Sequence, residues 1–181
     1  LLLGFKMQFE LTSIFLNNLK DSIDEKNNAV IKEQLKELYP PDIAQILNQL
    51  SDKEAAYVYE LLDNETAPEV LLELDEDKRE DLLATFSSKE IAEQLDNMDS
   101  DDAADVINEL PEEIQEEVLS QIEDIEQASD IADLMSFEEG TAGSLMAKEL
   151  VSVHAHETVS ACIDEIRRQT ESVDVLYAVY V

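Results

Sequence analysis

A repeat of twelve residues sets the spacing of the apolar positions along most of this chain. Seven consecutive blocks, from "YPPDIAQILNQL" at residues 39–50 to "PEEIQEEVLSQI" at residues 111–122, align without a gap. The ninth and twelfth positions are apolar in every block, and the eighth is apolar in all but one, where Gln94 stands. The stripe made by positions five, eight, nine and twelve has the spacing of an amphipathic helix and not the alternation of a strand.

The first positions of the blocks supply helix caps. Ser51 with Glu54, and Ser87 with Glu90, fit the S-x-x-E capping box. Three aspartates stand at the same first position, where they are favourable N-cap residues: Asp63, Asp75 and Asp99. Each block therefore predicts one helix of about nine or ten residues, roughly 15 Å long.

Helices this short are marginal alone, so their apolar stripes have to be buried on neighbouring repeats. We predict a mainly α fold, in which the short helices form a superhelical stack. A protein-interaction solenoid with no ligand is the plain alternative use of such an array.

Other elements flank the array. Residues 7–38 predict one or two further helices, and the helical pattern continues for one helix after the array. Residues 150–153, 158–170 and 175–181 then predict strand, helix and strand, with Thr158 as the helix cap. The last strand is almost wholly apolar, which is typical of a buried parallel strand. We expect an α/β module that is unfinished where the chain stops.

Charge distinguishes this chain from an ordinary helical domain. The 181 residues carry 44 Asp and Glu against 12 Lys and Arg, a formal net charge of −32, although 44% of them are hydrophobic and can form a core. Between Lys89 and Lys148 there is no base, and that interval holds 19 acidic residues. Nucleic-acid phosphates would repel such a chain, so we expect no nucleic-acid partner and favour cations or basic surfaces as partners. No apolar run approaches the roughly 18 residues of a membrane span, and we expect this segment to be soluble as it stands.

Acidic residues line one helix face in two of the blocks. Positions three, seven and eleven follow one another at i, i+4 and i+8, opposite the apolar stripe. Only the third and sixth blocks fill all three with acids: Glu65, Glu69, Glu73 and Asp101, Asp105, Glu109. Like charges at i and i+4 destabilise a helix by roughly 0.2–0.5 kcal/mol per pair. We infer that something outside the helix offsets this repulsion.

The acidic residues of the sixth block can be explained either as helix caps or as metal ligands. Asp99 and Asp102 lie at the N-cap and in the first turn, where the helix dipole favours negative charge, so capping explains them without a ligand. Asp101 can share in that role, but Asp105 lies a full turn in, and Glu69 occupies the same seventh position three blocks earlier. Asp105 and Glu69 are the better metal-ligand candidates, with a merely solvated acidic face as the alternative.

Oxygen-only ligands narrow the choice of metal. Carboxylates without thiolates suit Mg²⁺ or Ca²⁺, and Mn²⁺ stays open as a third ion. An EF-hand beginning at Asp99 is excluded, because it would need an oxygen ligand at Ala103, glycine at Ala104 and glutamate at Leu110. Mg²⁺ keeps several of its waters and uses one or two carboxylates, so it suits a helix-face cluster better than a caged Ca²⁺ does.

The remaining reactive side chains form no recognisable site. His154 and His156 alternate onto one face at a strand end without further zinc ligands, and the single Cys162 excludes an internal disulfide. No nucleophile, base and oxyanion hole can be assembled, so we do not expect an enzyme.

Three stretches of the chain carry a resemblance to a known family. They are "LYPPDIAQILNQL", "LDNMDSDDAADVINELPEE" and "FEEGTAGSLMAKELVSVHAHETVSACIDEIRR". In this order they resemble the cytosolic amino-terminal region of the MgtE family of magnesium transporters. A short-helix superhelix alone also resembles flagellar motor-switch proteins, but "TAGSLM" leading into strand, helix and strand is typical of the first CBS motif in MgtE.

The resemblance implies four segments. Residues 1–24 would be an N-terminal helix or tail, and residues 25–136 a superhelical N domain. Residues 137–149 would be a linker, and residues 150–181 the first part of an incomplete CBS domain.

The resemblance also implies a function. The family forms homodimeric, Mg²⁺-selective, channel-like transporters of the bacterial inner membrane, whose N and CBS domains are a cytosolic Mg²⁺ sensor. The implied partners are Mg²⁺, a second copy of the protein and its own transmembrane pore domain, which lies outside this chain. Bound Mg²⁺ would bridge acidic domain surfaces and favour the closed pore, and loss of Mg²⁺ would let those surfaces repel and separate.

Site residues follow from the matching motifs. The first and last acids of "DDAAD", Asp101 and Asp105, and Glu69 of "APEV" are implied Mg²⁺ ligands, with Asp102 as a further candidate. Gly140 departs from the Asp that usually precedes "TAG". Ala178 stands where some relatives carry Tyr near a CBS nucleotide pocket, which argues against adenine-nucleotide binding here. A motor-switch type of interaction superhelix and a CBS adenine-nucleotide sensor are the alternatives to Mg²⁺ sensing.

Overall fold

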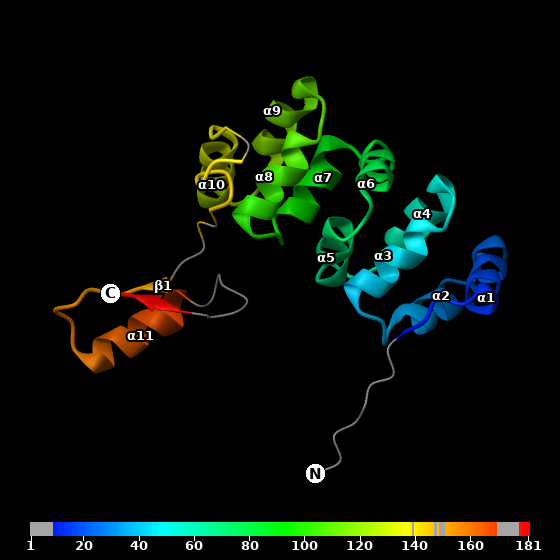
Figure 1. Cartoon of the computed structure of the whole chain (residues 1–181), viewed down its shortest axis with the longest axis horizontal. Helices are drawn as coiled ribbons and strands as arrows, with labels where there is room; N and C mark the ends of the chain where they lie inside the picture. Colours follow the sequence, from blue (N-terminus) through cyan, green and yellow to red (C-terminus); the bar gives the residue numbers. More distant parts are fainter. Residues whose placement is uncertain (1–8, 139, 147, 149–150, 170–177) are drawn as a thin grey trace, which may run out of the picture.

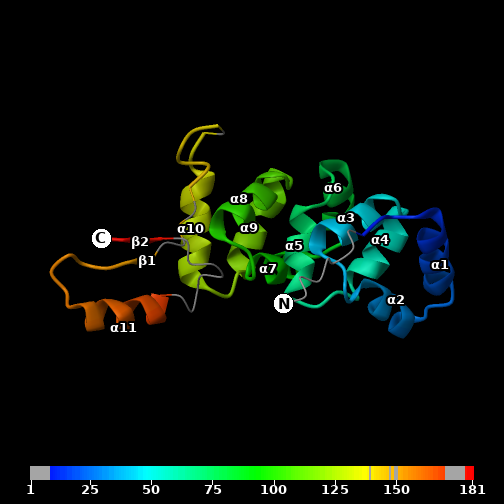
Figure 2. The same ribbon diagram turned by 60° about the horizontal axis from the view of Figure 1, so that its bottom comes forward.

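The computed structural model describes residues 9–138, 140–146, 148, 151–169 and 178–181. In this part of the chain, ten short helices, α1 to α10, follow one another along an arc (Figure 1). One more helix and a pair of short strands follow α10, at the end of the molecule opposite α1 (Figure 2). The predicted mainly α, superhelical fold is confirmed.

Each of the seven blocks forms one helix, as the repeat predicts. In order they are α3 (Pro40–Asn48), α4 (Asp52–Tyr59), α5 (Thr66–Leu72), α6 (Glu76–Leu83), α7 (Ser88–Leu95), α8 (Ser100–Asn108) and α9 (Glu112–Gln121). They have seven to ten residues, so the predicted length is too long for most of them. The shortest, α5, begins late because the Asp63 carboxylate accepts the amides of Glu65 and Thr66 and thereby caps a turn that precedes the helix.

The two predicted capping boxes form, whereas the N-cap of α5 is Glu65 and not the predicted Asp63. Glu54 accepts a hydrogen bond from the Ser51 amide at 2.9 Å, and Glu90 accepts one from the Ser87 amide at 2.8 Å. Both pairs complete a capping box. The backbone of α6 and α8 begins at the predicted N-cap residues Asp75 and Asp99.

Helices two apart in the sequence stack on one another. In one column α3 packs against α5, α5 against α7 and α7 against α9. In the other column α4 packs against α6, and α8 packs against α10 (Ile125–Met135). Within the described residues, α6 and α8 do not pack closely, so this column is loosest between them. The ninth-position side chains are buried in every block except the last, where Leu119 is half-buried, which explains why the apolar stripe recurs.

Gln94, the polar exception in the stripe, contacts a tyrosine of the core. The Tyr59 hydroxyl lies 3.0 Å from the Ala67 carbonyl and 3.0 Å from Oε1 of Gln94. The hydroxyl has one proton, so when it donates to Ala67 a rotated Gln94 amide can donate to it in turn. Burial raises the pKa of Tyr59 far above its ordinary value, so the hydroxyl keeps its proton.

Two helices precede the array, as predicted. They are α1 (Ser13–Asp24) and α2 (Asn28–Leu35). α1 packs against α2 and α4 and adds Leu19 and Ile23 to the common core. The domain division stays a prediction, and this packing favours a superhelical domain that starts at α1 and not at residue 25. Residues 1–8 of the predicted tail lie outside the described residues.

The segment after α10 is held to that helix. Lys148, the first base after the acidic interval, lies 3.3 Å from Asp133 and 3.8 Å from Asp130 of α10. A Cβ atom on Gly143 would meet the Phe137 ring at 2.4 Å, so the ring packs directly on this glycine. Gly140 has a φ of 75°, which glycine adopts without strain.

The predicted strand, helix and strand follow as β1 (Val151–Ser152), α11 (Val159–Gln169) and β2 (Val179–Tyr180). The strands pair in parallel and α11 packs against β1, as expected. The predicted burial of the last strand is wrong for its described residues, since Tyr180 is 62% exposed. An apolar strand is buried only if a second layer covers it, and α11 packs on β1 instead. Leu150 and residues 175–177 of the predicted strands lie outside the described residues.

Candidate metal site on helix α8

The first turn of α8 brings three acidic side chains together. Asp99 is the N-cap residue, and Asp101 and Asp102 lie in the first turn. One carboxylate oxygen from each of the three lies within 4.8 Å of the others. The positive end of the helix dipole reduces the cost of bringing these charges together, so the capping role and a cation site are compatible.

The helix presents its acids outward because its other face is made of small and apolar residues. Ser100, Ala103 and Ala104 are buried, where α8 packs against α9 and α10. Small side chains allow neighbouring helices to approach closely. Asp101 and Asp102 are therefore only half-buried at the edge of this contact, and Asp105 is exposed.

The predicted ligands are distributed over two helices. Asp101 and Asp102 belong to the cluster together with Asp99, whose main predicted role is capping. Asp105 is not in this three-residue group and follows Asp101 by one helical turn on the same face. Glu69 is exposed on a different helix, α5.

Glu69 borders an open groove of about 430 Å³ between the start of α3 and the end of α5. Its other lining residues are Tyr39, Pro40, Pro41, Leu72 and Glu73. Within the described residues neither Glu69 nor Glu73 has an ion-pair partner, so both carboxylates face solvent with their charge uncompensated by a neighbouring base.

The third acid of the α8 row, Glu109, is paired inside the protein. Arg79 of α6 meets its carboxylate with two parallel bonds, from Nε to Oε2 at 2.7 Å and from Nη2 to Oε1 at 2.6 Å. Glu109 is the C-cap of α8, where the helix dipole disfavours a negative charge. Arg79 therefore supplies part of the compensation that the repulsion along this row requires, and the predicted solvent-facing row ends at Asp105.

Sequence reasoning missed Arg79, although the repeat contains a signal for it. The fifth position of a block is apolar in five of the seven blocks and faces the core, but Arg79 occupies it in the fourth block. A charged residue at a core-facing position is almost never fully buried unless it is paired. Its side chain is only 15% exposed, so a buried partner could have been expected.

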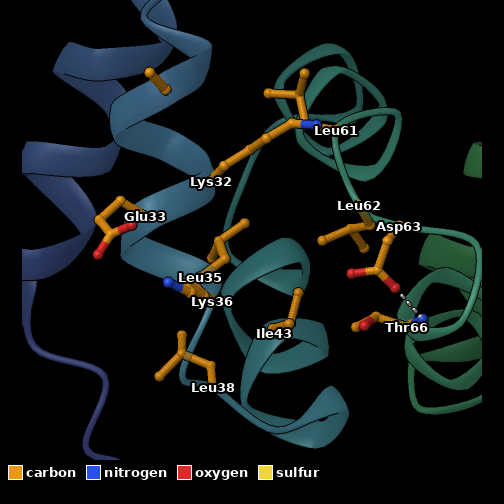
Figure 3. Close-up of a pocket in the computed structure, with 11 residues that line it drawn as sticks. Lys32, Glu33, Leu35, Lys36, Leu38, Ile43, Leu61, Leu62, Asp63 and Thr66 are labelled. Atoms are coloured by element: carbon orange, nitrogen blue, oxygen red, sulfur yellow. Dashed lines mark hydrogen bonds between the residues drawn. The ribbon is translucent and has the colours of Figure 1, made fainter.

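A second cavity, of about 280 Å³, lies between α2, α3 and the turn before α5 (Figure 3). Lys32 extends across it toward Leu61, and the Asp63 carboxylate is turned to Thr66 (Figure 3). Its two lysines, Lys32 and Lys36, and its apolar floor do not suit a hydrated cation. His154 and His156 are exposed surface residues whose stacked rings lie 5.4 Å apart between centroids.

These features define a class of protein, namely an acidic superhelical domain joined to an α/β module, with three carboxylates clustered at the start of α8. The chain belongs to the family of the MgtE intracellular N domain, whose model matches residues 38–140, more than half of the chain. The predicted family is thus confirmed, and the match favours it over a motor-switch protein. Within the described residues, no helix has both the length and the apolar character needed to cross a membrane.

Individual relatives agree with this family. The magnesium transporter MgtE of Enterococcus faecalis (strain ATCC 700802 / V583) is 36% identical over 56 residues, which are 31% of this chain and 12% of that protein. The crystal structure of the soluble part of a magnesium transporter shares the fold with a TM-score of 0.74 and 24% identity, over 93% of this chain and 66% of the other. The cytosolic domain of the Mg²⁺ channel MgtE in complex with ATP has a TM-score of 0.80 and 25% identity, over 92% and 68%. These relatives are named as a transporter and a channel, not as enzymes.

Proposed function

We propose that this chain is the Mg²⁺-sensing cytosolic part of a magnesium transporter of the bacterial inner membrane. The observation that carries the proposal is the acidic face of α8, where Asp99, Asp101 and Asp102 cluster and Asp105 follows on the next turn. It occurs in a member of the MgtE N-domain family, in an interval that has no base for 58 consecutive residues, 90–147.

In the proposed mechanism, Mg²⁺ docks surfaces that otherwise repel one another. A hydrated Mg²⁺ ion needs only one or two carboxylates from each surface, because it keeps several waters. Asp101 and Asp105 would be the ligands from α8, with Asp102 beside them, and Glu69 would contribute from α5. The second surface would come from the CBS domain or from the transmembrane pore domain of a homodimer. Mg²⁺ binds the docked state more tightly and so shifts the equilibrium toward a closed pore.

The proposal is tested by limited proteolysis of the full-length protein over a range of Mg²⁺ concentrations. We expect Mg²⁺ to protect the wild-type protein from cleavage. Asp101→Ala combined with Asp105→Ala should raise the Mg²⁺ concentration at half protection at least about tenfold, which corresponds to roughly 1.4 kcal/mol of lost binding free energy.

The matched control is Asp77→Ala combined with Asp81→Ala. These aspartates occupy the third and seventh positions of the fourth block and are exposed on α6, so the control changes the net charge equally. It should leave the midpoint unchanged. An unaltered midpoint in the α8 variant would show that the ligand assignment is wrong, and a wild-type protein without any Mg²⁺ response would refute the sensor itself.

ATP is the second candidate ligand, because one structural relative is described in complex with ATP. In the proposed CBS domain, Ala178 offers only an exposed methyl group where some relatives carry Tyr, so it provides no ring on which an adenine could stack. We therefore favour Mg²⁺ over ATP as the ligand of this chain. Calorimetric titration with ATP in the absence of Mg²⁺ separates the two ligands.

A further inference from the structure

Arg79 joins three helices of the superhelix at one point. From α6, its guanidinium forms the two parallel bonds to Glu109 at the end of α8. Its Nη1 also donates to the carbonyls of Leu72 at 2.9 Å and Leu71 at 3.4 Å, at the end of α5. The side chain of Arg79 is 15% exposed and that of Glu109 is 24% exposed, so both are largely withdrawn from water.

This contact lies where the stacking of helices is weakest. Helices two apart otherwise pack closely along this column, but α6 and α8 do not within the described residues. A charge-assisted, bidentate bond has a fixed direction, whereas apolar packing tolerates sliding. The Arg79 and Glu109 pair therefore sets the distance and rotation of α8 relative to α6.

The same side chain fixes α5. The carbonyls of Leu71 and Leu72, at the C-terminal end of α5, carry the negative end of the helix dipole, which the Arg79 guanidinium stabilises. The proposed metal ligands lie on the two helices that Arg79 joins, since Glu69 is on α5 and Asp101 and Asp105 are on α8.

We propose that Arg79 is a positioning residue for the Mg²⁺ site, which holds the acidic faces of α5 and α8 in the relation that a docked partner surface requires. This inference rests on the proposed function. It assigns Arg79 no contact with the ion. Its effect on Mg²⁺ is transmitted through Glu109 and the carbonyls of α5.

The test is Arg79→Lys in the full-length protein, with protease protection measured against Mg²⁺ concentration. Lysine keeps the charge but cannot form the two parallel bonds. We expect the Mg²⁺ midpoint to rise about threefold or more. Glu109→Gln should raise it similarly, and the double variant should add little to either single change, because both remove the same contact.

Lys78→Ala is the control for general destabilisation. Lys78 is the neighbouring residue on α6, equally 15% exposed, and it bonds the Leu50 carbonyl and Asp52 on the side of α4. Without Mg²⁺, both Lys78→Ala and Arg79→Lys should lower the midpoint temperature of thermal unfolding. Only Arg79→Lys should change the Mg²⁺ concentration at half protection from the protease.

Equal midpoint shifts in the two variants would attribute the effect to general destabilisation and overturn the inference. An unchanged midpoint in Arg79→Lys, alongside loss of protection in the Asp101 and Asp105 double variant, would refute the role of Arg79 alone. Absence of protection in the wild-type protein would refute the proposed function instead.

Discussion

Asp96 ends α7 in surroundings that disfavour its charge. Its partial burial raises the pKa of this carboxyl, and the nearby Glu123 and Asp124 add to the rise. The Glu123 amide donates to Oδ1 of Asp96 at 3.2 Å, which opposes the rise but does not cancel it. A carboxyl whose pKa is raised by folding contributes stability when protonated, and that contribution is lost as pH increases through the folded-state pKa.

Asp96→Asn should therefore stabilise the chain at neutral pH. The amide keeps an oxygen that can accept from Glu123 but carries no charge, and we expect the midpoint of thermal unfolding to rise by about 1 or 2 °C. The gain should shrink as pH is lowered through the pKa of Asp96, because the wild-type carboxyl then becomes neutral too. Asp77→Asn, at an exposed position, is the control. A gain that is equal at neutral and acidic pH would contradict this origin.

At the scale of the element, each short helix depends on its cap, because so few residues share the cost of the unpaired terminal amides. The capping box at the start of α4 illustrates this. The Ser51 hydroxyl, and then its backbone amide, hold the pKa of Glu54 below its ordinary value. A lowered pKa means that this contribution is present above the unfolded-state value and disappears as pH falls through the folded-state pKa.

Ser51→Ala should lower the free energy of unfolding by about 1 kcal/mol at neutral pH. The difference from the wild type should narrow in acid, since protonation of Glu54 weakens the wild-type box as well. Denaturant titrations at several pH values measure both effects. Ser129→Ala, an exposed serine inside α10, should cost nothing. If both variants lose the same stability, the cap is not the cause.

At the scale of the whole molecule, a net charge of −32 makes the response to salt informative. Any salt screens the repulsion among exposed carboxylates and favours compact states. A site with arranged ligands binds Mg²⁺ beyond this screening, because the ion is held by particular carboxylates.

MgCl₂ should therefore protect the full-length protein from proteolysis more strongly than NaCl of equal ionic strength. In the Asp101 and Asp105 double alanine variant, the two salts should protect almost equally, since only screening remains. Equal protection of the wild-type protein by both salts would show that the acidic face of α8 responds only to ionic screening and holds no specific Mg²⁺ site.

The amino-acid sequence by itself determined the helices and their order. A strict twelve-residue spacing with caps at the first position predicts seven helices, because both the apolar stripe and the capping bonds depend on neighbours within one turn or one block. The same spacing selected Asp101, Asp105 and Glu69 as outward acids, and the motifs around them indicated the family.

Only the tertiary structure decided that one acid of the α8 row is paired inside the protein. Glu109 has the same register as Asp101 and Asp105, yet it is bound by Arg79 from thirty residues earlier in the chain. The polar residue Gln94 in the apolar stripe is explained only by the folded structure, in which it contacts Tyr59, 35 residues away. The exposure of β2 likewise depended on which face α11 covers. Local spacing determines how a helix presents its faces, but the partners of a charged or polar side chain depend on which helices meet, and that is a property of the folded stack.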